Sequence, residues 1–140
     1  MSFSAQVKNE LARIIHENPK VQLSELSAII RMSGTLKLMG FNKLSFVINT
    51  ENPAIARKVF TLIKNCFGIT VEIQVNRQSN LKRNNTYVLS VTYDQGANDI
   101  LEKVGIIEKE GEHLSWVSTI PKHLVSRQDG KRAYLRGAFL

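Results

Sequence analysis

The order in which helix-like and strand-like hydrophobic patterns follow one another constrains the fold of this chain most. Segments with an apolar residue every three or four positions alternate with segments in which every second residue is apolar. The order is two helices, a pair of strands, a helix, a second pair of strands and further helices. Strand pairs that alternate with helices favour an antiparallel sheet covered by helices. The sequence therefore predicts an α+β fold.

The clearest helix lies in the segment "ENPAIARKVFTLIKNCFG", residues 51–68. Asn52 has the side chain of a good N-cap, Pro53 suits the first helical position, and Gly68 suits the residue after the last turn. Ile55 and Val59 begin an apolar face with helical spacing. We therefore expect a helix that begins at Pro53 and ends before Gly68.

The remaining elements follow from the same patterns. Asn18-Pro19 is expected to stop the first helix, and Gly34 to end the second in a left-handed conformation. Asp129 is expected to cap the last helix. The other predicted helices cover residues 3–17, 24–32, 97–104 and 121–126. The strand pairs are predicted around residues 35–38 with 44–48, and 71–75 with 87–93; we expect residues 106–119 to be irregular or weakly stranded.

Composition limits the class of protein. A chain of 140 residues with 43% hydrophobic residues can bury one ordinary core. Cys66 has no second cysteine to pair with, and the three histidines have no zinc-like spacing, so we expect no metal or cofactor. Charged residues near the N-terminus exclude a signal peptide, and no apolar run approaches the ~20 residues that cross a bilayer. We therefore expect a cytoplasmic protein without a membrane partner.

The net charge gives the first indication of a partner. The formal charge is +7 and the isoelectric point is about 9.8. A basic balance favours polyanions, with nucleic acid ahead of anionic membranes. Many proteins are mildly basic without binding either, so the charge alone does not decide the function.

Two stretches of the chain are related to each other. "LSAIIRMSG" and "LRGAFL" both place small residues between large apolar ones, with Ala28 corresponding to Gly137 and Ile29 to Ala138. Spacing alone favours the interpretation of two ordinary core helices. Both stretches, however, resemble degenerate copies of the LAGLIDADG motif, which pairs two helices in homing endonucleases. Together "ELSAIIRMSG", "TENPAIARKVF" and "KRAYLRGAFL" resemble the WhiA family of sporulation and cell-division regulators of Gram-positive bacteria.

The resemblance implies a specific domain organisation. Residues 1–22 would form an N-terminal helix and linker, residues 23–127 the first LAGLIDADG-like repeat (helix-strand-strand-helix-strand-strand-helix), and residues 128–140 the start of the second motif helix. Family members continue with a second repeat and a helix-turn-helix domain. We therefore expect this chain to be the front part of a longer protein and, by itself, to self-associate. The residues expected where the motif helices meet are Leu26, Ala28, Ile29, Ile30, Ser33, Gly137 and Ala138.

The resemblance also bears on catalysis. In active endonucleases an acidic residue before the final glycine of each motif holds divalent metal. Here Ser33 occupies that position, and Arg31 replaces the other acid of the motif. A hydroxyl is a poor sole ligand for Mg²⁺. No hydrolase or nucleotide-binding motif is present, and we interpret Cys66 as a packing residue rather than the partner of His123. We therefore expect no enzymatic activity.

Duplex DNA is the expected partner, bound weakly by these residues. In LAGLIDADG proteins the sheet and its hairpins follow the major groove, where Arg, Asn and Gln read base edges. The candidate residues are Lys37, Lys43, Gln74, Asn76, Arg77, Lys82 and Arg83. A polar hairpin is also typical of an ordinary solvated loop. Two hypotheses therefore remain: a nucleoid-associated, DNA-binding part of a regulator of transcription, cell division, chromosome segregation or sporulation, or a protein-interaction module whose DNA affinity resides in the helix-turn-helix.

Overall fold

The computed structural model describes residues 3–77, 85–117 and 119–140 and has the predicted α+β architecture. Its main sheet contains four antiparallel strands in the order β1-β2-β4-β3. These strands are β1 (Gly34–Gly40), β2 (Lys43–Thr50), β3 (Ile73–Arg77) and β4 (Asn85–Val91). A separate antiparallel hairpin consists of β5 (Ile107–Glu110) and β6 (His113–Trp116).

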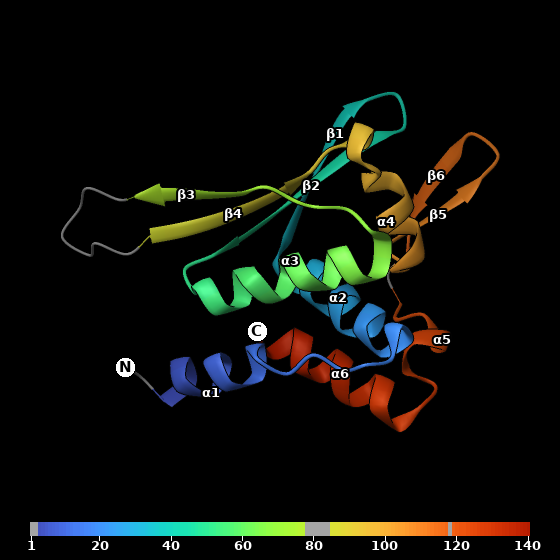
Figure 1. Ribbon diagram of the computed structural model, residues 1–140. Helices are drawn as coiled ribbons and strands as arrows, with labels where there is room; N and C mark the ends of the chain where they lie inside the picture. The colour runs from blue at the N-terminus through green and yellow to red at the C-terminus, as the bar shows by residue number, and fades with distance from the viewer. Residues whose placement is uncertain (1–2, 78–84, 118) are drawn as a thin grey trace.

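The helices lie on one side of the main sheet. They are α1 (Phe3–Ala12), α2 (Pro19–Ser33), α3 (Pro53–Phe67), α4 (Ala97–Lys103), α5 (Lys122–Val125) and α6 (Gln128–Phe139), with a 3-10 turn, η1 (Tyr93–Gln95). α2 and α3 contact the sheet, α6 packs along α2, and α1 contacts α3. Figure 1 shows α1 and α6 on the side of α2 and α3 that faces away from the sheet. None of the helices in the described residues covers the other face of the sheet (Figure 1).

The register of the sheet explains where the core forms. Phe46 of β2 pairs with Val91 of β4, and Ile48 pairs with Leu89. Each of these side chains is at most 1% exposed, because alternate residues of both strands point toward the helices. The helix residues that complete the core include Leu26, Ile29, Ile30, Val59, Leu62 and Ile63. The predicted alternation of the strands is therefore confirmed.

The start of α2 differs from the prediction. The sequence predicted a helix over 3–17 that Asn18-Pro19 ends, and a second helix from residue 24. In the structure Asn18 is the N-cap of α2: its Oδ1 accepts a hydrogen bond from the Lys20 N–H at 2.9 Å, and Pro19 occupies the first turn. The dipeptide thus starts a helix, and α1 already ends at Ala12. Residues 19–22, expected in a linker, belong to α2.

Helix termini confirm the predicted ends at Gly68 and Gly34 and correct the predicted cap at Asp129. Asn52 caps α3, accepting a hydrogen bond from the Ala54 N–H at 2.8 Å, and Gly68 is left-handed with φ +70°. Gly34 ends α2 as predicted, but its backbone is extended (φ −83°) rather than left-handed, and a Cβ there would lie 2.5 Å from the Ile30 carbonyl oxygen. A glycine is therefore needed at this position because a side chain would clash with the Ile30 carbonyl oxygen, and not because the backbone is left-handed. Asp129 lies inside the first turn of α6, which has no side-chain cap.

Candidate nucleic-acid interface

The face of the main sheet away from the helices carries mostly hydrogen-bonding side chains. Because successive strand residues point to opposite faces, the neighbours of the core residues point away from the helices. Asn49 pairs with Val88, which in turn pairs with Gln74, so these three form a row across β2, β4 and β3. The polar residues on this outer face are Thr35, Lys37, Ser45, Asn49, Gln74, Asn76, Thr86 and Ser90. Such side chains are suited to hydrogen bonding with a polar partner.

Three of the seven predicted DNA contacts lie on this outer face. Lys37, Gln74 and Asn76 belong to it by strand alternation and are exposed. Lys43 is exposed at the start of β2, where its Nζ lies 5.5 Å from the centre of the Tyr93 ring. Arg77 is separated from them. It is in register with Ile73 and Val75, so it points to the helix side at the end of β3. Lys82 and Arg83 lie outside the described residues.

The end of α2, where an endonuclease would hold metal, has a different chemistry. Ser33 is exposed and borders the sheet rather than the buried helix contact. The Arg31 guanidinium donates hydrogen bonds to the carbonyl oxygens of Val117 (3.0 Å) and Gly105 (3.1 Å). Arg31 therefore ties the end of α2 to the loops around β5 and β6. This structural role had not been predicted from the sequence.

The described residues contain neither a metal-ligand cluster nor a membrane span. No group of three or more His, Cys, Asp or Glu side chains among them could hold a metal ion. No helix in the same residues is both long and apolar enough to cross a bilayer. Cys66 is half-buried: its Sγ lies 3.9 Å from the Pro19 carbonyl oxygen, and burial raises the pKa of the thiol to about 11.

The two motif stretches form a close helix pair. A Cβ on Gly137 would lie 2.4 Å from the Glu25 carbonyl oxygen and 3.1 Å from the Ala28 Cβ. Gly137 of α6 therefore contacts the backbone of α2 directly. The Ser24 hydroxyl adds a hydrogen bond to the Gly130 carbonyl oxygen at 2.8 Å. Of the residues expected at this contact, Leu26, Ala28, Ile29, Ile30 and Gly137 are buried, Ala138 is half-buried and Ser33 is exposed.

A buried ionic cluster crosses the helix pair. The Glu25 carboxylate of α2 forms an ion pair with Lys58 of α3 through Oε1, and its Oε2 lies 2.5 Å from Arg136 Nε of α6. Glu25 and Lys58 are each 2% exposed. Burial, with the Arg136 charge as a second cause, lowers the pKa of Lys58 to about 7. One carboxylate thus serves two cations, and the cluster joins three helices.

This cluster was not among the features predicted from the sequence. Lys58 follows Ile55 by three positions and precedes Val59, so it lies within the apolar face of α3. A charged residue at such a position is an indication of a buried ion pair, because it needs a partner there. Its ion-pair partner Glu25, however, is 33 positions away in the sequence, and Arg136, which binds the same carboxylate, is 78 positions away. No local pattern identifies them.

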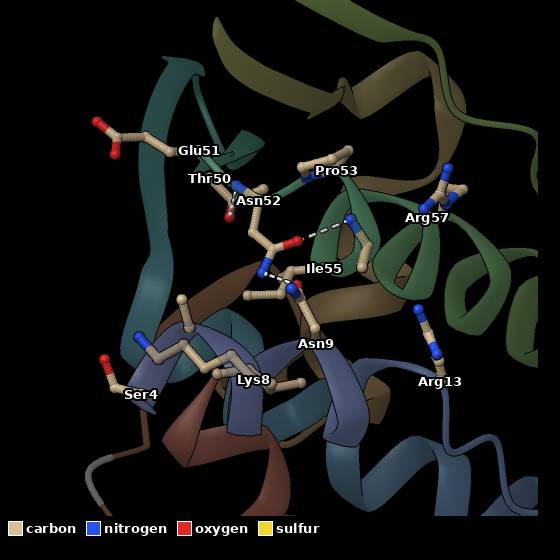
Figure 2. Close-up of a pocket in the computed structure, with 13 residues that line it drawn as sticks. Ser4, Lys8, Asn9, Arg13, Thr50, Glu51, Asn52, Pro53, Ile55 and Arg57 are labelled. Carbon is tan, nitrogen blue, oxygen red and sulfur yellow. Dashed lines mark hydrogen bonds between the residues drawn. The ribbon is translucent and has the colours of Figure 1, made fainter. Parts of the chain in front are cut away.

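A cleft of about 850 Å³ lies between α1 and the start of α3. Its basic side chains are Lys8, Arg13 and Arg57, and Glu51 is the acidic one. Figure 2 shows Asn9 and the N-cap residue Asn52 meeting in this cleft, where Asn52 Nδ2 donates a hydrogen bond to Asn9 Oδ1 at 2.6 Å. The cleft is on the helix side of the domain and is thus separate from the outer face of the sheet.

Comparison with known proteins decides the family. The model of the WhiA N-terminal LAGLIDADG-like domain matches residues 19–107, from the first residue of α2 to the start of β5. The chain belongs to the WhiA family. This match covers more than half of the chain and includes the first motif helix, the whole main sheet and α3.

The WhiA relatives align along the entire chain. It is 49% identical over 141 residues to a protein of Alkaliphilus oremlandii and 42% identical over 140 residues to one of Clostridium acetobutylicum, both named "Probable cell division protein WhiA". Each alignment covers 100% of this chain and 44% of the relative. The chain therefore spans less than half the length of these WhiA proteins.

Two solved structures share the fold. Full-length DUF199/WhiA from Thermatoga maritima superposes with a TM-score of 0.63 at 19% identity, over 100% of this chain and 39% of the other. The N-terminal LAGLIDADG domain of DUF199/WhiA gives a TM-score of 0.65 at 20% identity, over 99% of this chain and 57% of the other. The predicted LAGLIDADG-like repeat with an antiparallel sheet is thereby confirmed as the fold.

Proposed function

We propose that this chain is a non-catalytic, DNA-binding module of a WhiA-type regulator that acts on transcription, in cell division, chromosome segregation or sporulation. The outer face of the main sheet would contact duplex DNA at the nucleoid, in the cytoplasm. The observation that carries the proposal is the row of Asn49, Val88 and Gln74 with Lys37 on the same uncovered face. Amide side chains read base edges in the major groove, and lysine contacts phosphate.

The same geometry argues for binding without cleavage. The position where an endonuclease needs a carboxylate is the exposed Ser33, and Arg31 is engaged with backbone carbonyl oxygens. Few cations lie on the outer face, so the predicted affinity is low. A handful of phosphate contacts corresponds to a Kd on the order of 10⁻⁴ M, with a marked dependence on salt.

We expect fluorescence anisotropy with labelled duplex DNA to locate the binding face. The variant Lys37→Ala/Asn49→Ala/Gln74→Ala removes one charge and two amides from the outer face, and we expect about tenfold weaker binding at low salt. Losing one phosphate contact should also reduce the slope of log K against log salt by about 0.9.

The matched control is Lys64→Ala/Asn65→Ala/Gln128→Ala, which removes the same groups from exposed positions on α3 and α6. We expect it to bind like the original chain. If both triple variants lose the same affinity, the effect is one of net charge, and the outer face is not the DNA site.

A second function has its own supporting observation. Leu135 and Phe139 of α6 are 70% and 47% exposed, whereas the matching residues of α2, Leu26 and Ile30, are buried. We propose that this apolar face of α6 is a protein-interaction surface, covered in a whole WhiA protein by its second repeat and in this chain alone by a second copy. The helix-turn-helix of the whole protein would then contribute DNA contacts of its own.

A further inference from the structure

Helix α1 is held to the domain by little apolar contact. Within Phe3–Ala12 only Ala12 is buried, and Val7 and Leu11 are half-buried. Phe3 is 81% exposed, and Ile14, just after the helix, is 45% exposed. An isolated helix of ten residues is marginal in water, so its neighbours must stabilise it. Polar contacts therefore have a large share in holding α1 in place.

The main polar contact comes from Lys58 of α3. Its Nζ donates hydrogen bonds to the carbonyl oxygens of Leu11 at 2.9 Å and Ile14 at 2.6 Å. These carbonyls belong to the end of α1 and the turn after it, where helix carbonyls lack partners within the helix. A donor from another helix thus terminates α1. A lysine there also complements the negative end of the helix dipole.

Lys58 connects this helix end to the buried ionic cluster. The same Nζ forms an ion pair with Glu25, which also binds Arg136. The amino group therefore has two hydrogen-bond acceptors on the α1 side and an anionic partner on α2. Toward its middle α1 also makes the Asn9–Asn52 hydrogen bond, and Lys8 Nζ lies 5.8 Å from the centre of the Phe139 ring.

We propose that α1 is a strap that opens as a unit from the helix side of the domain, and that the amino group of Lys58 is the latch that keeps it closed. Opening would widen the basic cleft, because α1 forms one of its walls (Figure 2). It would also remove Lys8 from Phe139. The strap thereby controls access to the cleft and to the end of α6, while the sheet keeps its fold.

Hydrogen–deuterium exchange followed by mass spectrometry tests the latch. Lys58→Met keeps an unbranched side chain in the buried site, removes the donor to Leu11 and Ile14, and leaves Glu25 paired with Arg136. We expect the amides of residues 7–14 to exchange at least tenfold faster, while those of α2 and β2 keep their protection. Lys64→Met, an exposed lysine in the same helix, is the control and should change neither.

Protection of residues 7–14 within twofold of the original chain in Lys58→Met would overturn the proposal. If Lys58→Met instead raises exchange in every element, a second experiment tests the proposal on the unaltered chain. It measures native-state hydrogen exchange at increasing urea concentration and compares the opening free energies of the α1 and α2 amides. We expect the α1 amides to open with a smaller free energy and a weaker urea dependence than the α2 amides. Identical values for both helices would show that α1 opens only with the whole domain, which also overturns the proposal.

Discussion

Replacing Glu25 by glutamine is expected to lower the free energy of unfolding by about 3–5 kcal/mol at pH 6. The substitution keeps the shape of the side chain but removes the one anion that serves both Lys58 and Arg136. Two cations would then share a site that excludes water. Removing one partner of a buried ion pair leaves an uncompensated charge, which destabilises the fold more than replacing the whole pair by apolar residues does.

This loss should become smaller as the pH rises. In the unaltered chain the pKa of Lys58 is about 7, well below the usual 10.5. Below pH 7 the lysine is charged in both the folded and the unfolded chain, so folding carries the full cost of burying the charge. Between pH 7 and 10.5 the buried amine is neutral while the unfolded chain still binds the proton, so the free energy of unfolding rises with pH. Without Glu25 the pKa of Lys58 falls further, so the same rise begins at lower pH. We therefore expect a larger stability difference at pH 6 than at pH 8.5.

Urea unfolding followed by circular dichroism measures both effects. The control is Glu72→Gln, an exposed carboxylate, which should stay within about 0.5 kcal/mol of the original chain at either pH. A loss below about 1 kcal/mol for Glu25→Gln at pH 6 would contradict a structural role for the cluster.

The second large effect is expected for Gly137→Ala. The new Cβ would lie 2.4 Å from the Glu25 carbonyl oxygen, which is backbone and cannot rotate away. The two helices must therefore move apart, and we expect a loss of about 1–3 kcal/mol. Alanine is the better helix former by ~1 kcal/mol, so any net loss underestimates the clash.

Thermal or urea unfolding of Gly137→Ala measures this loss. The control is Arg132→Ala, a substitution at an exposed position of the same helix. The control should change stability by no more than about 0.5 kcal/mol. A Gly137→Ala variant more stable than the original chain would mean that α2 and α6 do not pack backbone to backbone.

Helix boundaries could be predicted where local chemistry was unambiguous. Asn52-Pro53 was correctly predicted to start a helix, because the preceding residues alternate like a strand. Asn18-Pro19 is the same dipeptide with the same geometry, but the apolar spacing of Leu11, Ile14 and Ile15 suggested a helix running into it. That spacing instead continues past the end of α1 into the turn that Lys58 terminates.

Local sequence patterns were not sufficient to predict the short hairpin of β5 and β6. Each strand has four residues, and in β5 only Ile107 is buried, so there is too little alternation to detect. Its position depends on distant contacts, including the hydrogen bond from Arg31 to Val117. Sequence patterns record local periodicity, whereas this hairpin is positioned by tertiary structure.

The candidate site was predictable in part for the same reason. Strand alternation placed Gln74 and Asn76 on the outer face, and the strand register agrees. Arg77 was grouped with them by composition, although its register position puts it on the helix side. The Glu25 cluster was not predictable, since Glu25 and Arg136 are 111 positions apart and meet only through the helix pair.

Mapping the DNA-binding face by nuclear magnetic resonance tests the central claim most directly. A 15.8 kDa chain is small enough for ¹⁵N-labelled spectra during titration with duplex DNA at low salt. We predict the largest shifts at amides of the outer face, around Lys37, Asn49 and Gln74, with little change along α3. Shifts confined to the helix side, or none at millimolar DNA, would contradict a DNA-binding role for the sheet.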